Sequence, residues 1–163
     1  MSDTDPAQEL NSTEAPDLEL SVIIPARNEQ RSLASCLASI LSQSEPGFLL
    51  GQQWELIVVN DDSTDSTRTI AAEAAATHEG VLVLDAPPLD LSANGGFTGK
   101  TNACWTGAQA ARGRNLLFTD ADTIHETNDI SRSLREADRH NAALLSYSPA
   151  KSSPASGSTP SCR

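Results

Sequence analysis

The sequence predicts an α/β fold in which a mostly parallel sheet carries helices on both of its faces. Short apolar segments alternate along the chain with longer segments of helical periodicity. This alternation is typical of strand–helix–strand units, which build parallel sheets. The segment 54–59 is apolar at almost every position, as expected of a strand that is buried on both sides. The chain has 163 residues, which is enough for one ordinary domain with a core.

The first strand is expected at 18–24, where Pro25 ends it. A helix should follow over 29–42, because Leu33 and Leu37 fall on one helical face. By the same criteria we expect, in order, a strand at 54–59, a helix from 65 or 66 to 78, a strand at 81–84, a helix at 100–112, a strand at 115–119, a helix at 128–140 and a fifth strand at 142–146.

The ordered domain is expected to span residues 19–147, between two segments of different composition. Residues 1–18 are acidic and polar, which predicts a disordered lead-in, and residues 148–163 are rich in Ser and Pro, which predicts a flexible tail. Because the strand–helix pattern stops at this tail, we expect the fold to be incomplete at its C-terminal end.

Composition argues against several classes of protein. The net charge of −11 disfavours binding to nucleic acid or to an anionic membrane. The three cysteines are far apart and form no zinc or disulfide pattern, so we expect buried thiols in a reducing compartment. There is no signal-peptide pattern at the N-terminus and no apolar run long enough to cross a bilayer. We therefore expect a cytoplasmic location and no membrane span in this chain.

Polar clusters follow three of the predicted strands, at 25–29, at 60–63 and at 120–122. In open parallel sheets, ligands bind beyond the carboxyl ends of the strands. The sequence therefore predicts that these three clusters line one rim of the sheet and form a binding site there.

Asp120 and Asp122 are one residue apart, just beyond a predicted strand. Both carboxylates can reach a hard cation such as Mg²⁺ or Mn²⁺, which often shares its oxygen ligands with substrate phosphates. The alternative is an ordinary turn or helix cap, where Asp is also favoured. His125 follows closely, either as a third ligand or lid residue or, as we expect, as a surface or capping residue.

Asp61 follows the second strand, where its carboxylate can accept the N–H of a pyrimidine base. The structural alternative for this stretch is capping of the next helix by Ser63 or Asp65, and both functions are compatible. Arg27 and Lys100 are cations in an acidic chain and suit contacts with phosphate, although each could also be a solvated surface residue.

Lys100 belongs to the stretch GGFTGKT, residues 95–101, which looks at first like a P-loop. A P-loop requires a glycine, four free residues and then Gly-Lys, and counting back from Gly99 places Asn94 where the first glycine should be. The preceding apolar run ends at Leu84, so the stretch does not leave its strand directly. We therefore expect a Gly-rich turn at a helix start, where backbone N–H groups favour anions. Cys104 and Trp105, further along this helix, are expected in the core.

Together and in this order, four stretches resemble the glycosyltransferase family 2 enzymes with the GT-A fold: SVIIPARNE, WELIVVNDDSTDST, GFTGKTNACWTGAQAA and LLFTDADT. The resemblance covers about residues 19–147, and the third stretch is most similar to a subgroup associated with hopanoid and carotenoid lipid pathways. It implies a Rossmann-like GT-A domain that binds a UDP-sugar with Mg²⁺ or Mn²⁺. It also implies inverting transfer of a hexosyl group to a lipid or saccharide acceptor.

The resemblance also implies roles for matching residues. Pro25, Arg27 and Glu29 stand where the family's first loop surrounds the nucleotide. Asp61 matches the carboxylate that contacts uracil, and Lys100 matches a lysine near the base and the diphosphate.

Asp120 and Asp122 match the family's DxD motif. The resemblance implies that Asp120 lies near the ribose and that Asp122 binds the metal that bridges the diphosphate. The metal then stabilises the leaving nucleoside diphosphate. By this resemblance, GGFTGKT serves a sugar nucleotide and not the hydrolysis of ATP.

The chain also departs from the family pattern. Family members commonly have Gly where this chain has Asp62. The family's acceptor-binding half, its downstream catalytic Asp and the subgroup's C-terminal membrane segments have no counterpart before Arg163, although full-length relatives are often at the cytoplasmic face of the inner membrane. We therefore expect a donor-binding portion with weak or no transferase activity. The alternatives are a non-catalytic nucleotide-sugar-binding module, a nucleotidyltransferase-like enzyme and a fragment without a function of its own.

Overall fold

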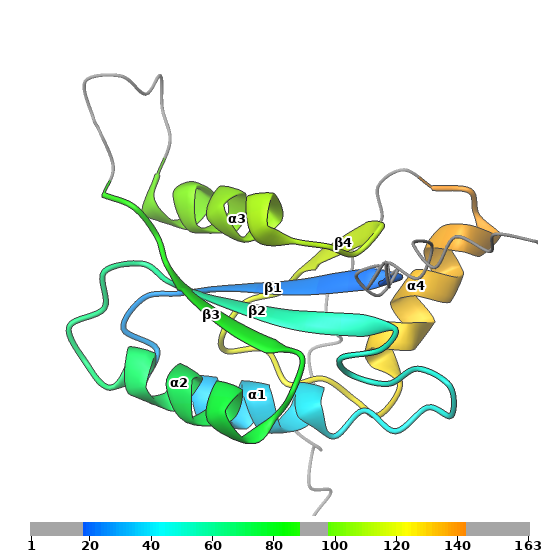
Figure 1. Cartoon of the computed structure of the whole chain (residues 1–163), viewed down its shortest axis with the longest axis horizontal. Coiled ribbons are helices and arrows are strands. Elements are labelled where there is room, and N and C mark those ends of the chain that lie inside the picture. The colour runs from blue at the N-terminus through cyan, green and yellow to red at the C-terminus, as the bar shows by residue number, and fades with distance from the viewer. Residues whose placement is uncertain (1–17, 89–97, 143–163) are drawn as a thin grey trace, which may run out of the picture.

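The computed structural model describes residues 18–88 and 98–142. Its centre is a sheet of four parallel strands in the order β3-β2-β1-β4 (Figure 1). The predicted α/β class and the parallel sheet are confirmed. The strands are β1 (Leu20–Ala26), β2 (Trp54–Asn60), β3 (Val81–Asp85) and β4 (Asn115–Phe118).

Helices cover both faces of this sheet, as predicted (Figure 1). α1 (Leu33–Leu41) and α2 (Thr67–Thr77) lie on one face, and α3 (Gly99–Ala110) lies on the other. α4 (Asp129–Arg139) adds Ile130 to the core beneath α1. The sheet is thus sandwiched between two helical layers, and the carboxyl ends of its strands stay open at one rim.

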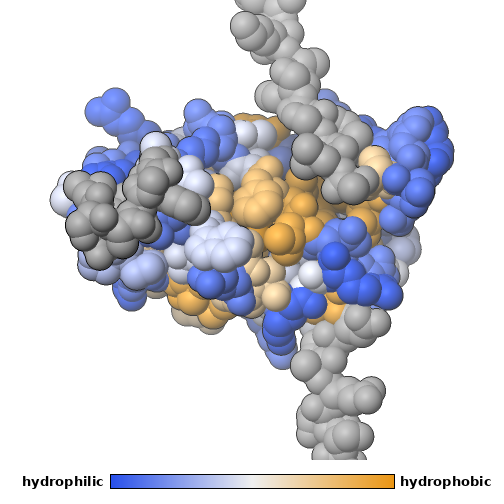
Figure 2. All heavy atoms as spheres, turned by 90° about the horizontal axis from the view of Figure 1, so that it is seen from above, coloured by the Kyte–Doolittle hydropathy of each residue, from blue (hydrophilic) through white to orange (hydrophobic). Residues whose placement is uncertain are grey.

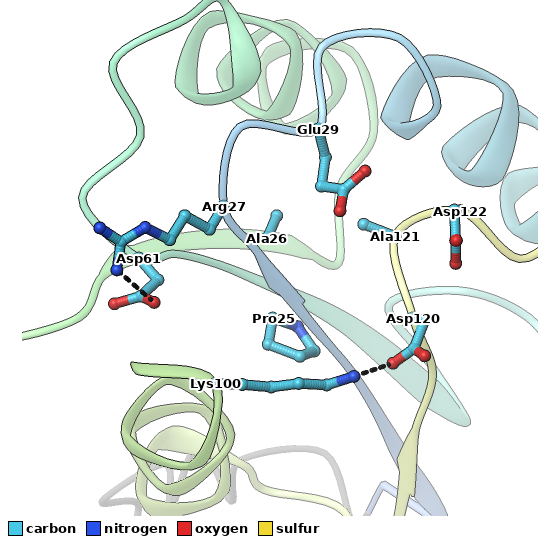
Figure 3. A pocket seen from close by; sticks show the side chains of 9 residues that line it. All are labelled: Pro25, Ala26, Arg27, Glu29, Asp61, Lys100, Asp120, Ala121 and Asp122. Carbon is cyan, nitrogen blue, oxygen red and sulfur yellow. Dashed lines mark hydrogen bonds and ion pairs between the residues drawn. The ribbon is translucent and has the colours of Figure 1, made fainter. Parts of the chain in front are cut away.

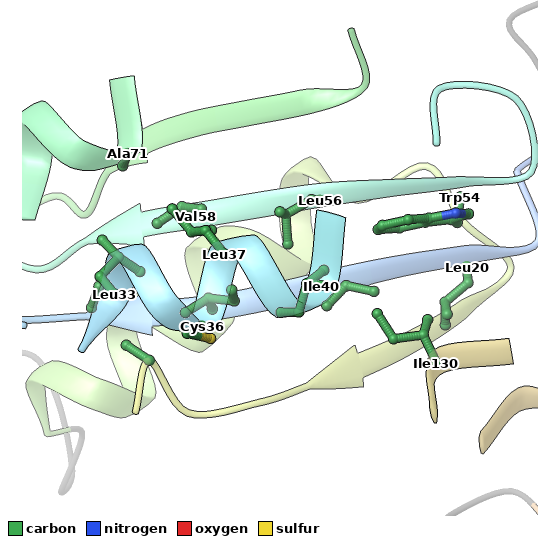
Figure 4. Close-up of a cluster of buried hydrophobic side chains, with 14 of the residues drawn as sticks. Leu20, Leu33, Cys36, Leu37, Ile40, Trp54, Leu56, Val58, Ala71 and Ile130 are labelled. Atoms are coloured by element: carbon green, nitrogen blue, oxygen red, sulfur yellow. The ribbon is translucent and has the colours of Figure 1, made fainter. Parts of the chain in front are cut away.

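The larger core lies between the sheet and α1 (Figure 4). Side chains of β1 alternate between the two faces, so that Val22 and Ile24 enter this core while Ile23 faces α3. α3 packs closely on the second face, because a Cβ on Gly107 would lie 2.5 Å from Ile23 Cγ2. Small residues therefore bring α3 and its first turn close to the strand ends.

Two element boundaries differ from the expected ones. β1 continues through Pro25 to Ala26, whereas the sequence suggested that the proline ends it. The Ile23 carbonyl accepts the Thr119 N–H, so the backbone polar groups of Ile23 point toward β4. The backbone of Pro25, two residues further on, has the same orientation, but the pairing with β4 ends before Pro25. Its missing N–H therefore costs no ladder hydrogen bond.

The first helix also starts later than predicted. Residues 29–32 form turns, in which the Glu29 carbonyl accepts the N–H of Ser32 and of Leu33, and α1 begins at Leu33. Asn28 has a positive φ of 54°, which sets the chain direction after β1. The proposed fifth strand, the acidic lead-in and the Ser/Pro-rich tail lie outside the described residues, except for Leu18 and Ala142 at their borders.

Trp105 and Cys104 were expected in the core, and this prediction is wrong. Trp105 is 57% exposed and Cys104 is half-buried, because α3 turns Ala103 and Gly107 toward the sheet instead. Phe118, on β4, is 47% exposed on the same side of the sheet. Apolar surface gathers on this side of the molecule (Figure 2). Within residues 18–88 and 98–142, no helix has the length and apolar character that a membrane span requires.

Candidate functional site

The open rim of the sheet contains a cavity of about 290 Å³ (Figure 3). Its walls come from the ends of β1, β2 and β4 and from the first turn of α3. Every site residue predicted from the sequence lines this cavity. The lining residues are Pro25, Ala26, Arg27, Glu29, Asp61, Lys100, Asp120, Ala121 and Asp122.

Asp61 follows β2 and is almost buried, whereas its partner Arg27, which follows β1, is exposed. The Asp61 side chain is 12% exposed, and its Oδ2 lies 3.6 Å from Arg27 Nη1. The Asp61 N–H donates to the Ala26 carbonyl, so the end of β1 fixes the Asp61 backbone. A nearly buried carboxylate beside an exposed cation suits recognition of a neutral N–H group, because the guanidinium has room to turn toward another ligand group.

The loops after β1 and β2 hold each other in place. Asn28 donates its N–H to Ser63 Oγ at 3.1 Å, and its Oδ1 accepts the N–H of Thr64 at 2.9 Å. Asp62 has a positive φ of 51°, a conformation that Gly adopts most easily and Asp tolerates. The chain therefore keeps a left-handed turn at the position where glycine is common in the family it resembles. Asp65 accepts the N–H of Thr67, the first residue of α2, whereas Ser66, the N-cap residue, makes no side-chain capping hydrogen bond.

Lys100 reaches across the cavity to the loop after β4. Its Nζ donates to Asp120 Oδ1 at 2.7 Å, and this hydrogen bond raises the pKa of Lys100 above its ordinary value (Figure 3). Both side chains are more than half exposed, so the pair contributes little to stability and can open readily. Thr98 caps α3 by accepting the N–H of Thr101 at 3.4 Å. The first turn of α3 thus places a cation and a helix N-terminus at the rim.

Asp120 and Asp122 flank Ala121, which is buried in the core beneath α1. Asp122 is exposed, and its carboxylate makes no hydrogen bond or ion pair with a residue in the described ranges. Below this loop, burial and then the nearby charge of Asp122 raise the pKa of Cys36 to about 11. The Cys36 thiol therefore stays protonated, and it donates to the Asp120 carbonyl at 3.6 Å.

The donor set fits a metal that the protein shares with its ligand. Within 18–88 and 98–142, no three His, Cys, Asp or Glu side chains gather into a complete metal site. Mg²⁺ and Mn²⁺ accept hard oxygen ligands, and Mg²⁺ usually keeps several waters and phosphate oxygens beside one or two carboxylates. Asp122, with Asp120, supplies carboxylates of this kind at the mouth of the cavity.

His125 is neither an exposed surface residue nor a ligand beside Asp122. Its side chain is 12% exposed, and burial lowers its pKa. One ring nitrogen, Nε2, lies 2.9 Å from Thr119 Oγ1, and the other, Nδ1, lies 4.0 Å from Asp129 Oδ2. The ring thus supports the loop after β4 from within.

A second hollow, of about 450 Å³, adjoins the first and shares Arg27 and Asp61 with it. Its further wall includes Asp85, at the end of β3, which the sequence reasoning did not single out. Asp85 accepts three hydrogen bonds from Arg68 Nε and Nη2 at 2.8–3.1 Å, and these bonds lower its pKa. Its position after the β3 run was the signal that could have identified it, by the same strand-end rule.

Comparisons with known proteins agree with this arrangement. The family model described as "Glycosyl transferase family 2" matches residues 21–162. A dolichyl-phosphate beta-glucosyltransferase of Drosophila melanogaster is 43% identical over 117 residues, which are 67% of this chain and 32% of the relative. A 4,4'-diaponeurosporenoate glycosyltransferase of Staphylococcus aureus is 36% identical over 115 residues, 71% of this chain and 27% of the relative. The chain thus spans about a third of these relatives' length.

Two solved structures share the fold and were obtained with nucleotides. Glucosyl-3-phosphoglycerate synthase from Mycobacterium tuberculosis, in complex with Mn²⁺, UDP and glucosyl-3-phosphoglycerate, has a TM-score of 0.52 and 27% identity, over 74% of this chain and 39% of that one. Mannosyltransferase PcManGT from Pyrobaculum calidifontis, in complex with GDP-Man and Mn²⁺, has a TM-score of 0.60 and 25% identity, over 76% and 34%. The motifs, the parallel sheet with its open rim and these matches lead to one conclusion: the chain belongs to glycosyltransferase family 2.

Proposed function

We propose that this chain is the donor-binding portion of a metal-dependent glycosyltransferase and that it binds a UDP-sugar at the open rim. One observation carries the proposal. A nearly buried carboxylate, a cation at a helix start and an exposed carboxylate without a partner among the described residues, from three separate segments, line a single cavity. These are the groups that a base, a diphosphate and a shared metal ion require.

Each residue has a role in this proposal. Asp61 accepts an N–H of the uracil, and Arg27 next to it closes over the base. Pro25 and Glu29 complete the wall on the β1 side. Lys100 turns from Asp120 to the diphosphate, since the exposed ion pair opens at little cost.

The released Asp120 carboxylate accepts a hydrogen bond from a ribose hydroxyl, and Asp122 would hold the Mg²⁺ or Mn²⁺. When bound, this metal would stabilise the charge of the leaving nucleoside diphosphate. Lys100 and the N–H groups of the first turn of α3 add positive potential on the same side.

The second half of the reaction is also part of the proposal. The acceptor is a lipid or a saccharide, the transfer is inverting and the transferred group is a hexosyl. The likeness to the diaponeurosporenoate glycosyltransferase supports an acceptor of the lipid type. We assign no catalytic base to this chain and expect it to transfer poorly on its own.

Calorimetric titration of UDP into the purified chain, with Mn²⁺ and with EDTA, tests the proposal. We expect binding that Mn²⁺ strengthens, and GDP and UTP serve as parallel titrants. A chain that unfolds cooperatively but binds no UDP would contradict the donor site. Tighter binding of GDP than of UDP would mean that the site takes a guanine nucleotide and not a uracil nucleotide. Turnover of UTP with a sugar phosphate to release pyrophosphate would favour a nucleotidyltransferase.

Gly99→Ala should weaken UDP binding by about tenfold, equivalent to 1.4 kcal/mol. A Cβ at this position would lie 2.4 Å from Asp61 Oδ2 and 3.4 Å from Arg27 Nη1. The Asp61 carboxylate is the end of a side chain and would turn away, so the base would lose its partner while the fold persists. Titration of UDP measures the affinity, and urea unfolding checks the fold. Affinity equal to that of the unmodified chain would contradict the placement of the base at Asp61.

A further inference from the structure

The loop that carries Asp120 and Asp122 is fastened to one face of α1. We name residues 119–126 the metal loop. Cys36 and Ser39 lie on α1 and Gln43 follows just after its C-terminal cap, at spacings that place all three side chains on the same side of the helix.

The first fastening point is at the start of the metal loop. Cys36 Sγ donates to the Asp120 carbonyl at 3.6 Å, and the Thr123 N–H donates to the same carbonyl at 3.2 Å. Ala121 is 3% exposed and packs among the core residues beside α1. The backbone on the N-terminal side of Asp122 is therefore held from below.

The second fastening point is at the end of the metal loop. Ser39 Oγ accepts the His125 N–H at 3.0 Å and donates to the Cys36 carbonyl at 2.7 Å, which orients the hydroxyl. Gln43 Nε2 donates to the Glu126 carbonyl at 2.9 Å. The backbone on the C-terminal side of Asp122 is held by these two bonds.

Asp122 lies between these points, and its carboxylate has no bond to a residue of the described ranges that would orient it. Its position therefore depends on the backbone of the metal loop. A metal ligand must be held to within about 0.5 Å of its productive geometry. We propose that Cys36, Ser39 and Gln43 are positioning residues, which hold the metal loop so that Asp122 can take the metal. This inference rests on the proposed function.

Ser39→Ala provides the test. It removes the acceptor of the His125 N–H, and its methyl group still fits the space. The readout is the ratio of the UDP dissociation constants measured with EDTA and with Mn²⁺. We expect this ratio to fall by about tenfold, as for other groups that orient metal ligands, while binding in EDTA stays unchanged. A purely structural role of Ser39 would lower the melting temperature and leave the ratio as it is.

Ser42→Ala is the matched control, because the exposed Ser42 hydroxyl donates to the Ser39 carbonyl and not to the metal loop. Gln43→Ala, which removes the bond to the Glu126 carbonyl and also the bond that Gln43 Oε1 accepts from the Ile130 N–H, is the second variant should Ser39→Ala fail to fold. Amide hydrogen exchange of the metal-free chain is the second readout. We expect faster exchange at His125 in Ser39→Ala and an unchanged rate in Ser42→Ala.

The outcomes separate the inference from the function beneath it. If Mn²⁺ strengthens UDP binding to the unmodified chain but also does so equally in Ser39→Ala and Gln43→Ala, the inference is overturned and the donor site stands. An unchanged exchange rate of the His125 amide in Ser39→Ala would likewise show that Ser39 does not hold the metal loop. If Mn²⁺ has no effect on the unmodified chain, both the proposed metal role and the inference fail.

Discussion

Asp122→Asn should abolish the effect of Mn²⁺ on UDP binding and leave the fold intact. The exposed carboxylate has no partner among the described residues, so its replacement by an amide of the same shape breaks no structural contact. The amide lacks the negative charge of the carboxylate and should bind a divalent cation much more weakly. Changes to groups behind a metal ligand cost about 10–100-fold in metal affinity, so loss of the ligand itself should exceed this range.

The measurement is the calorimetric titration of UDP with Mn²⁺ and with EDTA. Asp138→Asn is the matched control, since it makes the same chemical change at an exposed position of α4, away from the rim. The control should behave as the unmodified chain does. A full Mn²⁺ effect in Asp122→Asn would mean that the metal takes its carboxylate from elsewhere.

Glu55→Ala should lower the free energy of unfolding by on the order of 3 kcal/mol. Glu55 lies in β2 and is 2% exposed. Its Oε1 accepts the Ser21 hydroxyl and the Arg112 N–H, both at 2.7 Å. Its Oε2 accepts the Arg112 guanidinium at 2.7–2.9 Å. Truncation would leave the buried Ser21 hydroxyl and the Arg112 N–H without their acceptor.

Urea unfolding followed by circular dichroism measures this loss. Glu73→Ala, at an exposed position of α2, is the matched control and should change the free energy of unfolding only slightly. A loss for Glu55→Ala as small as that of the control would show that the hydrogen bonds at Glu55 contribute little.

The same network makes stability depend on pH. Burial alone would raise the pKa of Glu55, but the hydrogen bonds from Arg112 and Ser21 outweigh it, and the pKa is lowered. A carboxyl whose pKa is lower in the folded state contributes stability above its ordinary pKa near 4.5 and loses it as the pH falls toward the folded value. Glu55→Gln should therefore reduce the acid dependence of the unfolding free energy in this range.

The convergence of the site residues was predictable because it follows from one rule. Parallel strands end at the same edge, so Asp61 after β2 and Asp120 after β4 had to meet there. Lys100 could be added because a Gly-rich stretch of sequence precedes its helix. The rule uses only strand positions, which the apolar runs of this chain mark clearly.

The side-chain partners were not predictable in this way. Trp105 was expected in the core on its apolar character, yet α3 turns Ala103 and Gly107 to the sheet because only small residues allow the close approach. Ser39 and Gln43 looked like ordinary polar positions of a helix. Their partners lie more than 80 positions away, and a local pattern carries no information on such pairs.

The strand order has a consequence for how this chain is made. Of the four described strands, β1 leaves the ribosome first, yet it lies inside the sheet between β2 and β4, and Asn115 at the start of β4 contacts Glu19 across 96 positions. Parallel neighbours cannot close through a hairpin, so each pairing must first overcome the entropy of a long loop. Until β4 emerges, one edge of this apolar central strand remains without its partner. A nascent chain that pauses before residue 115 should therefore depend on chaperones to avoid aggregation.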